Sequence, residues 1–329
     1  MANSSIVPRP SEAAARQRST RLGDLIAIAR PDHWFKNIFM LPGAALALVL
    51  ADESLAPELA HLLLGVVSTC LIVSANYTIN EWLDAEFDRH HPAKQHRPSA
   101  AGRLSARLVY LQWGVLALAG LALASAITSY FLLFASALLL MGLVYNVRPL
   151  RVKDRQYLDV LSESINNALR FLLGWSAIVD GVLPPSSILI AYWMGGAYLM
   201  AVKRFAELRF IADPELAGRY RRSFRFYTEE GLLASAFFYA LLSAFFLGVF
   251  LIKYRIEFLL CMPFLALLFT WYLIIGMRAG SVAQSPEKLY QEKPFVAYVV
   301  ALALLIVLLF FVDLPWLDPL MESRGFAPR

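Results

Sequence analysis

Long apolar segments separated by polar connections run along almost the whole chain. Most of them approach the roughly 20 residues that a helix needs to cross about 30 Å of hydrocarbon. Because lipid cannot satisfy the backbone of loops or sheet edges, each segment is expected to be a helix. The pattern predicts an all-α, polytopic membrane protein with nine transmembrane helices around a central cavity, at about residues 38–51, 59–79, 108–127, 129–146, 164–182, 187–202, 231–252, 257–276 and 295–313.

The composition agrees with a bilayer as the solvent. The 329 residues are 59% hydrophobic and 17% charged, and the mean hydropathy is +0.56. A soluble domain of this size cannot remove so much apolar surface from water. Cys70 and Cys261 lie inside apolar segments, where buried thiols are expected rather than a disulfide or a metal site. The net charge of +5 is modest; we expect no nucleic-acid partner, and the oligomeric state stays open.

Lysine and arginine concentrate in alternate connections, which indicates the orientation of the chain. The basic residues on the sparse side are Lys253, Arg255, Arg324 and Arg329. We therefore expect a bacterial inner-membrane protein with a cytosolic N-terminus and the C-terminus outside. Residues 1–37 read as a cytosolic lead-in and interfacial segment without the apolar stretch of a signal peptide. Residues 38–313 are the expected transmembrane catalytic domain, and residues 314–329 a short non-cytosolic tail.

An acidic stripe follows the second apolar segment. Asn80, Asp84 and Asp88 recur at i, i+4 and i+8, so on a helix they share one face, with Glu81 beside them. Like charges repel at this spacing, and the negative end of the helix dipole adds to the repulsion. A bound Mg²⁺ would remove both effects, since it takes oxygen ligands together with substrate phosphates. The alternative is an exposed polar turn that nearby cations neutralise.

Two cations come shortly after the stripe. Lys94 and Arg97 are suited to holding phosphate oxygens beside a metal. Three histidines in the same stretch raise the possibility of zinc, but their spacing fits no usual ligand pattern and no cysteine is near. The stripe and these cations together predict a site for a magnesium-complexed diphosphate.

The stretch from Asn80 to Pro98 reads N-E-x-x-D-x-x-x-D-R-x-H-P-x-K-x-x-R-P. It closely resembles the first signature of the UbiA superfamily of intramembrane transferases, in which the second position is usually aspartate instead of Glu81. The resemblance implies nine transmembrane helices and a cytosol-facing active site. It also implies Mg²⁺ held by Asp84 and Asp88, with Asn80 and Glu81 as further ligands.

Other polar positions in the cytosolic half are candidates for binding substrate. Lys36, in R-P-x-x-W-x-K-N, is either an interfacial anchor or a substrate ligand. Tyr145, followed by Arg148, Arg151 and Lys153, resembles a superfamily Y-x-x-x-K motif, although these cations also suit positive-inside topology. Asp159 shares a helical face with Glu163, Asn166 and Arg170. That face is expected to line a cavity; the alternative is an internal ion pair such as Glu163–Arg170.

The connection after the sixth segment separates two branches of the superfamily. Members that use isoprenyl diphosphates generally carry a second D-x-x-x-D motif there. This chain instead has Lys203, Arg204 and Glu207, and the pattern resembles the decaprenyl-phosphate phosphoribosyltransferase branch. Extra positive charge suits a donor with an additional phosphate, or an acceptor that is itself a lipid phosphate.

The resemblance implies transfer of 5-phosphoribosyl from phosphoribosyl diphosphate to a polyprenyl phosphate, with diphosphate released. Such a product would feed an arabinose-type donor for cell-surface or secreted glycans. One alternative is a prenyltransferase that acts on an aromatic or other acceptor. A transporter is the second alternative, but charges that lie on one side of the membrane do not suit a substrate pathway across it.

Overall fold

The computed structural model describes residues 22–51, 53–89, 94–211, 214–254, 256–284 and 286–317. Within these ranges the chain is helical and contains no strand. The α-helices are α1 (Leu22–Ala29), α2 (Leu41–Leu50), α3 (Leu55–Asp88), α4 (Ala106–Ala124), α5 (Ser129–Asn146), α6 (Leu158–Ser176), α7 (Ser186–Ile211), α8 (Pro214–Tyr220), α9 (Glu229–Tyr254), α10 (Met262–Met277) and α11 (Lys293–Phe311). The 3-10 helices are η1 (Pro31–Met40), η2 (Val152–Asp154), η3 (Arg222–Arg225), η4 (Ile256–Cys261), η5 (Val282–Gln284), η6 (Pro286–Gln291) and η7 (Pro315–Leu317).

The apolar segments of the sequence all fall on helices, which confirms an all-helical, multi-pass membrane protein. Among the described residues, 6 helical segments are long and apolar enough to cross a membrane. They are 22–50, 55–88, 106–124, 129–146, 229–254 and 256–277. The other three predicted segments correspond to α6 and α7, which carry buried charged residues, and to α11, whose apolar part is shorter.

The first predicted segment is longer and less regular than its apolar residues indicate. Arg30 ends α1 with a positive φ of 52°, and η1 follows with Pro31 in its first turn. His33 and Asn37 are buried in η1. The boundary at residue 37 that was expected between the lead-in and the membrane domain therefore falls inside η1. Polar contacts hold η1 against the bundle.

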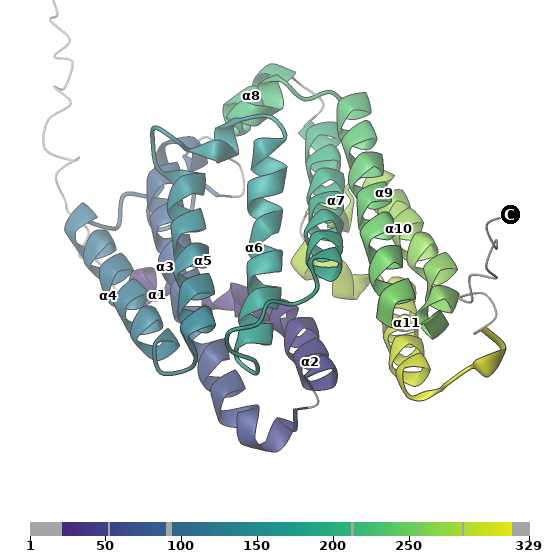
Figure 1. Cartoon of the computed structure of the whole chain (residues 1–329). Coiled ribbons are helices and arrows are strands. Elements are labelled where there is room, and N and C mark those ends of the chain that lie inside the picture. The colour runs from purple at the N-terminus through teal and green to yellow at the C-terminus, as the bar shows by residue number, and fades with distance from the viewer. Residues whose placement is uncertain are drawn as a thin grey trace, which may run out of the picture.

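The helices form two groups that α6 joins. Figure 1 shows α3, α4 and α5 on one side, α7, α9, α10 and α11 on the other, and α6 between them. The strongest packing is of α7 on α9 and of α3 on α4. Each group has its own apolar core, one built around Tyr198 and Tyr272 and the other around Phe131 and Leu173.

Two glycines bring the N-terminal segment close to α6. A Cβ added to Gly43 of α2 would lie 1.9 Å from the Phe171 carbonyl oxygen, and one added to Gly174 of α6 would lie 1.9 Å from that of Met40. Small residues of this kind let membrane helices approach closely. As a result, the polar side chains of η1 reach the polar residues of α6.

Connections between helices cover one end of the bundle. In Figure 1, α8 lies over the top, and it packs against η3, α3 and α7. The acidic end of α3 reaches this same end. The connection that contains η2 also lies here, packed against α5, α6 and η3.

Candidate active site

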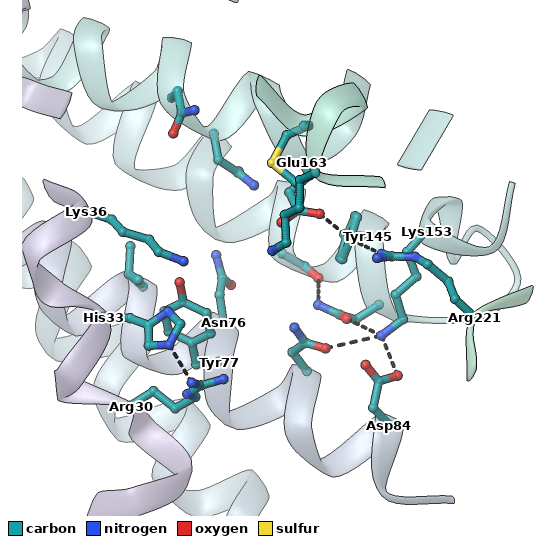
Figure 2. Close-up of a pocket in the computed structure, with 18 of the residues that line it drawn as sticks. Arg30, His33, Lys36, Asn76, Tyr77, Asp84, Tyr145, Lys153, Glu163 and Arg221 are labelled. Carbon is teal, nitrogen blue, oxygen red and sulfur yellow. Dashed lines mark hydrogen bonds and ion pairs between the residues drawn. The ribbon is translucent and has the colours of Figure 1, made fainter. Parts of the chain in front are cut away.

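A polar cavity of about 470 Å³ opens at this end of the bundle, among side chains from both helix groups. Figure 2 shows Asp84, Lys153 and Arg221 at one end of it and Arg30, His33 and Lys36 at the other. The polar residues at the first end are Asn80, Asp84, Asp88, Lys94, Tyr145, Asn146, Arg151, Lys153, Asp154, Arg221 and Arg222.

The acidic stripe faces this cavity. Helix α3 continues without a break to Asp88, so Asn80, Asp84 and Asp88 line the cavity from successive turns. Cations neutralise both carboxylates. Arg97 donates to Asp88 Oδ2 at 2.7 Å, and Arg151 and Lys153 both donate to Asp84 Oδ1, at 2.8 and 2.5 Å.

The segment 151–154 brings two buried cations to Asp84. Arg151 has a positive φ of 29°, a strained backbone for a residue with a side chain, and such strain costs about 1–3 kcal/mol. Its guanidinium also bonds Asp154 Oδ2 at 3.1 Å and the Asn146 carbonyl at 3.1 Å. These bonds fix the segment against the end of α5.

Burial lowers the pKa values of two lysines at this end of the cavity toward neutral pH. Burial lowers the pKa of Lys153 to about 8, although the attraction of Asp84 opposes the shift. Burial likewise lowers the pKa of Lys94 to about 8, opposed by Asp88 and Glu207. Both lysines are charged below that pH and can bind phosphate oxygens there.

An aromatic ring joins the loops at the cavity rim. The Arg151 and Arg222 guanidinium carbons each lie 5.3 Å from the Phe87 ring centroid. Such cation–π contacts hold a guanidinium without neutralising its charge. Phe87 therefore connects the end of α3 to the segments that carry both arginines.

The end of α7 is built around a fully buried arginine. Arg204 bonds Asp159 Oδ2 at 3.2 Å and Glu207 Oε2 at 2.8 Å, and it also bonds Glu163. Asp159 accepts two further hydrogen bonds, from Tyr227 at 2.6 Å and Ser223 at 3.2 Å. This network ties α6, α7 and the η3 connection together.

The opposite end of the cavity contains several cations. Arg170 is buried and bonds Asn37 Oδ1 at 3.0 Å and the Asn166 carbonyl at 3.2 Å. In the described part of the chain, neither Arg170 nor Lys203 forms an ion pair. Lys36 lines the same cavity. An anion bound here would meet several positive charges.

Eleven of the predicted site residues line the cavity. They are Lys36, Asn80, Asp84, Asp88, Lys94, Tyr145, Arg151, Lys153, Lys203, Arg204 and Glu207. Of the cations that follow Tyr145, the cavity therefore receives Arg151 and Lys153. Of the α6 face that was expected to line a cavity, Glu163, Asn166 and Arg170 do so. The alternative, an ion pair between Glu163 and Arg170, does not form among the described residues, because Glu163 pairs with Arg204.

Four predicted residues lie elsewhere. Glu81 follows Asn80 on α3, but its side chain is buried outside the cavity and accepts a hydrogen bond from the Ser99 N–H at 3.4 Å. Arg97 reaches Asp88 from outside the cavity, and Arg148 is exposed on a separate surface pocket. Asp159 is fully buried behind Arg204. The geometry supports positioning roles for Glu81 and Asp159 and gives no support to metal binding by Glu81.

Sequence reasoning missed several polar residues of the cavity. Asn146 Oδ1 accepts a hydrogen bond from Lys153 at 2.7 Å, and Arg221 donates to the Tyr145 hydroxyl at 2.5 Å. Asn76 lines the cavity one turn before Asn80. The i, i+4 spacing of the stripe extends back to Asn76 and was a usable signal. His91 and Pro92 of the motif lie outside the described residues.

The oxygen donors of the α3 stripe suit a magnesium ion that substrate phosphates complete. Within the described ranges, no group of three His, Cys, Asp or Glu side chains is gathered for a metal. Magnesium needs no such group, because one or two carboxylates with phosphate oxygens suffice. Asp84, Asp88 and the Asn80 amide oxygen meet this requirement. Zinc is not supported by this set of donors.

Fold and site together define a polytopic membrane protein with a charged ligand cavity at one end of its helical bundle. The family model described as "UbiA prenyltransferase family" matches residues 40–291, which is most of the chain. The chain therefore belongs to the UbiA prenyltransferase family, whose members are transferases.

Within the family, the chain is similar to decaprenyl-phosphate phosphoribosyltransferases. It is 30% identical over 210 residues to a decaprenyl-phosphate phosphoribosyltransferase of Mycolicibacterium smegmatis. The match covers 63% of this chain and 64% of that protein, so it spans just under two thirds of the relative's length. A shorter match, 33% identical over 103 residues, is to a 4-hydroxybenzoate octaprenyltransferase of Polynucleobacter asymbioticus; it covers 31% of this chain and 34% of that protein.

Solved structures share the fold. A UbiA homolog from Archaeoglobus fulgidus bound to GPP and Mg²⁺ has a TM-score of 0.64 at 24% identity, covering 85% of this chain and 99% of that one. The same homolog bound to DMAPP and Mg²⁺ also has a TM-score of 0.64, at 22% identity, covering 85% and 98%. This agreement confirms the UbiA-like helical arrangement.

Proposed function

We propose that this protein transfers 5-phosphoribosyl from phosphoribosyl diphosphate to a polyprenyl phosphate and releases diphosphate. An oxygen of the lipid phosphate forms a bond to C1 of the ribose as the bond from C1 to the diphosphate breaks. Because the acceptor oxygen is already anionic, the reaction needs no strong general base. The product is a lipid-linked sugar phosphate, suited to arabinose-type glycan synthesis.

The observation that carries this proposal is the chemistry at the end of α7. An isoprenyl diphosphate donor would call for a second carboxylate clamp there. The carboxylates present, Glu163 and Glu207, are instead bonded to Arg204, while Lys203 lines the cavity without an ion pair among the described residues. One end of the cavity thus offers carboxylates for a metal, and the other offers cations for a second anion.

Each substrate has its own end of the cavity in this proposal. Asp84, Asp88 and Asn80 hold Mg²⁺, which when bound stabilises negative charge on the leaving diphosphate. Lys94, Lys153 and Arg221 hold oxygens of the donor phosphates. Lys203, Arg170 and Lys36 bind the phosphate of the lipid acceptor. Tyr145 and Arg204 position the groups between the two ends.

The cavity would open on the cytosolic side of a bacterial inner membrane. The family resemblance and the basic connections support nine spans, with α6, α7 and α11 added to the 6 apolar ones. Apart from the exposed Arg209 near the end of α7, the charged residues of α6 and α7 face the cavity or one another. Both helices can therefore lie in the membrane without exposing charge to lipid. The N-terminus is then cytosolic and the C-terminus outside.

A product assay tests the proposal. Purified protein receives radiolabelled phosphoribosyl diphosphate with polyprenyl phosphate in one reaction, and a labelled isoprenyl diphosphate with 4-hydroxybenzoate in the other. We expect labelled lipid in the first reaction, at the mass of a polyprenyl phosphoribosyl phosphate. Labelled lipid in the second reaction alone would replace our proposal with a prenyltransferase.

A further inference from the structure

The ammonium group of Lys153 lies inside a cage of oxygen atoms. Its Nζ is 2.5 Å from Asp84 Oδ1, 2.7 Å from Asn146 Oδ1 and 3.2 Å from Asn80 Oδ1. Only 5% of the residue is exposed. Figure 2 shows Lys153 pointing toward Asp84, with a dashed line joining the two side chains. The cage consists entirely of carboxylate and amide oxygens, which are ligands that magnesium accepts.

The cage is rigid, and the lysine is delivered to it by a short connection. Asn80 and Asp84 belong to α3, and Asn146 is the last residue of α5. Lys153 instead lies in the three-residue η2, outside the two long helices that hold the cage. Without a cation, Asp84 would be a partly buried carboxylate at the negative end of a helix dipole. Lys153 removes that penalty in the ligand-free protein together with Arg151, which donates to the same Asp84 oxygen at 2.8 Å.

We propose that Lys153 stands in for the divalent cation, so that the metal enters only together with the diphosphate. This inference rests on the proposed function, because it assumes that Asp84 is a metal ligand. A metal ion that binds without diphosphate would have to displace the buried ammonium of Lys153. The ammonium and the metal ion would then lie close together as two positive charges. A diphosphate arriving with the metal gives the released ammonium new oxygen partners. Lys153 therefore sets the order of binding.

Manganese binding in the absence of donor tests this role. Full-length protein in lipid nanodiscs is titrated with Mn²⁺, and electron paramagnetic resonance measures the free ion. Replacing Lys153 by Met removes the competing charge and keeps the length of the side chain. Because a neighbouring like charge strongly opposes a bound cation, we expect Lys153→Met to bind Mn²⁺ at least about tenfold more tightly than wild type.

A matched control removes the same charge from the same connection. Arg155 is exposed and does not line the cavity, so Arg155→Met should leave Mn²⁺ affinity within about twofold of wild type. Should Lys153→Met fold poorly, Lys153→Gln serves the same purpose with a polar side chain. Unchanged Mn²⁺ affinity in the folded variants would overturn the inference.

A second mutation separates this inference from the proposed function. In the Lys153→Met background, Asp84→Asn should remove the gained affinity. If it does not, the ion binds elsewhere and the inference is wrong. If the gain depends on Asp84 but the wild-type protein transfers no phosphoribosyl group, the role of Lys153 stands and the proposed donor is wrong.

Discussion

The ends of α3 and α7 meet at the cavity, and their buried charges are neutralised in opposite ways. At the end of α3, Asp84 and Asp88 face the cavity and are neutralised by cations from connections between helices, Lys153 and Arg97. At the end of α7, the arginine is central, and Arg204 is neutralised by Asp159, Glu163 and Glu207. Those acids come from α6 and α7, inside the bundle.

The difference indicates which charges exchange partners during turnover. Counterions on connections can move away when a ligand offers better partners, so the acids of α3 are suited to binding a metal. Counterions on packed helices cannot move without disturbing the fold. The Arg204 network is therefore structural, and Lys203 beside it is the cation that remains for a ligand.

The largest effect should come from breaking the α7 network. Arg204→Met leaves three carboxylates facing one another, and removing one partner of a buried ion pair costs about 3–5 kcal/mol. We expect a clear fall in the thermal-unfolding midpoint in detergent, followed by fluorescence-detected size exclusion. Arg204→Lys keeps the charge and should lose less. A midpoint unchanged by Arg204→Met would show that the network contributes little stability.

At the end of α3, mutation should reduce activity and leave the fold intact. Removing one charge-stabilising group from an active site lowers the rate by roughly 100- to 1,000-fold, and we expect a loss of this size for Asp84→Asn. Glu86 is exposed on the other side of α3, so Glu86→Gln is the matched control and should retain activity. Initial rates at saturating Mg²⁺ measure both. Equal rates for Asp84→Asn and wild type would exclude the site.

A mutation at one end of the cavity should change KM for only one of the two substrates. Lys203→Met removes one charged contact to the acceptor phosphate, worth about 1.5–3 kcal/mol, so KM for the polyprenyl phosphate should rise at least tenfold. KM for the donor should stay within about twofold. Arg209 is exposed further along α7, and Arg209→Met controls for the loss of charge. A rise in donor KM alone would reverse our assignment of the two ends.

The smallest effect should appear with pH. The pKa of Lys94 and the pKa of Lys153 are each lowered to about 8 by burial, so both lysines are charged at pH 7 and lose their protons as pH rises. Since kcat/KM reports the free enzyme, its value for the donor should fall about threefold between pH 7 and 8 and further above. Lys94→Arg, which stays charged, should weaken that decline. A kcat/KM that rises above pH 8 would contradict these roles.

The all-helical membrane fold was predictable from sequence, because helices in lipid follow apolar length. The number of spans does not follow from apolar length alone, since only 6 of the described helical segments are long and apolar enough. The stripe on α3 was also predictable, since its members lie on one helix at fixed spacing. The partners of the stripe were not, because Arg151 and Lys153 reach Asp84 through a tertiary contact between α5, η2 and α3. The same limit applies to Arg204, whose cationic motif suggested phosphate binding until its three carboxylate partners were seen. Glu81 was predicted as a metal ligand because it is next to Asn80 in the motif. Adjacent residues on a helix point in different directions, and Glu81 does not line the cavity.

A structure with Mg²⁺ and phosphoribosyl diphosphate bound is the most direct test of the central claim. Electron cryomicroscopy of the protein in nanodiscs should show the metal between the diphosphate and the carboxylates of Asp84 and Asp88, with Lys153 moved from Asp84 onto a phosphate oxygen. Diphosphate bound away from α3, with Asp84 still paired to Lys153, would contradict the account.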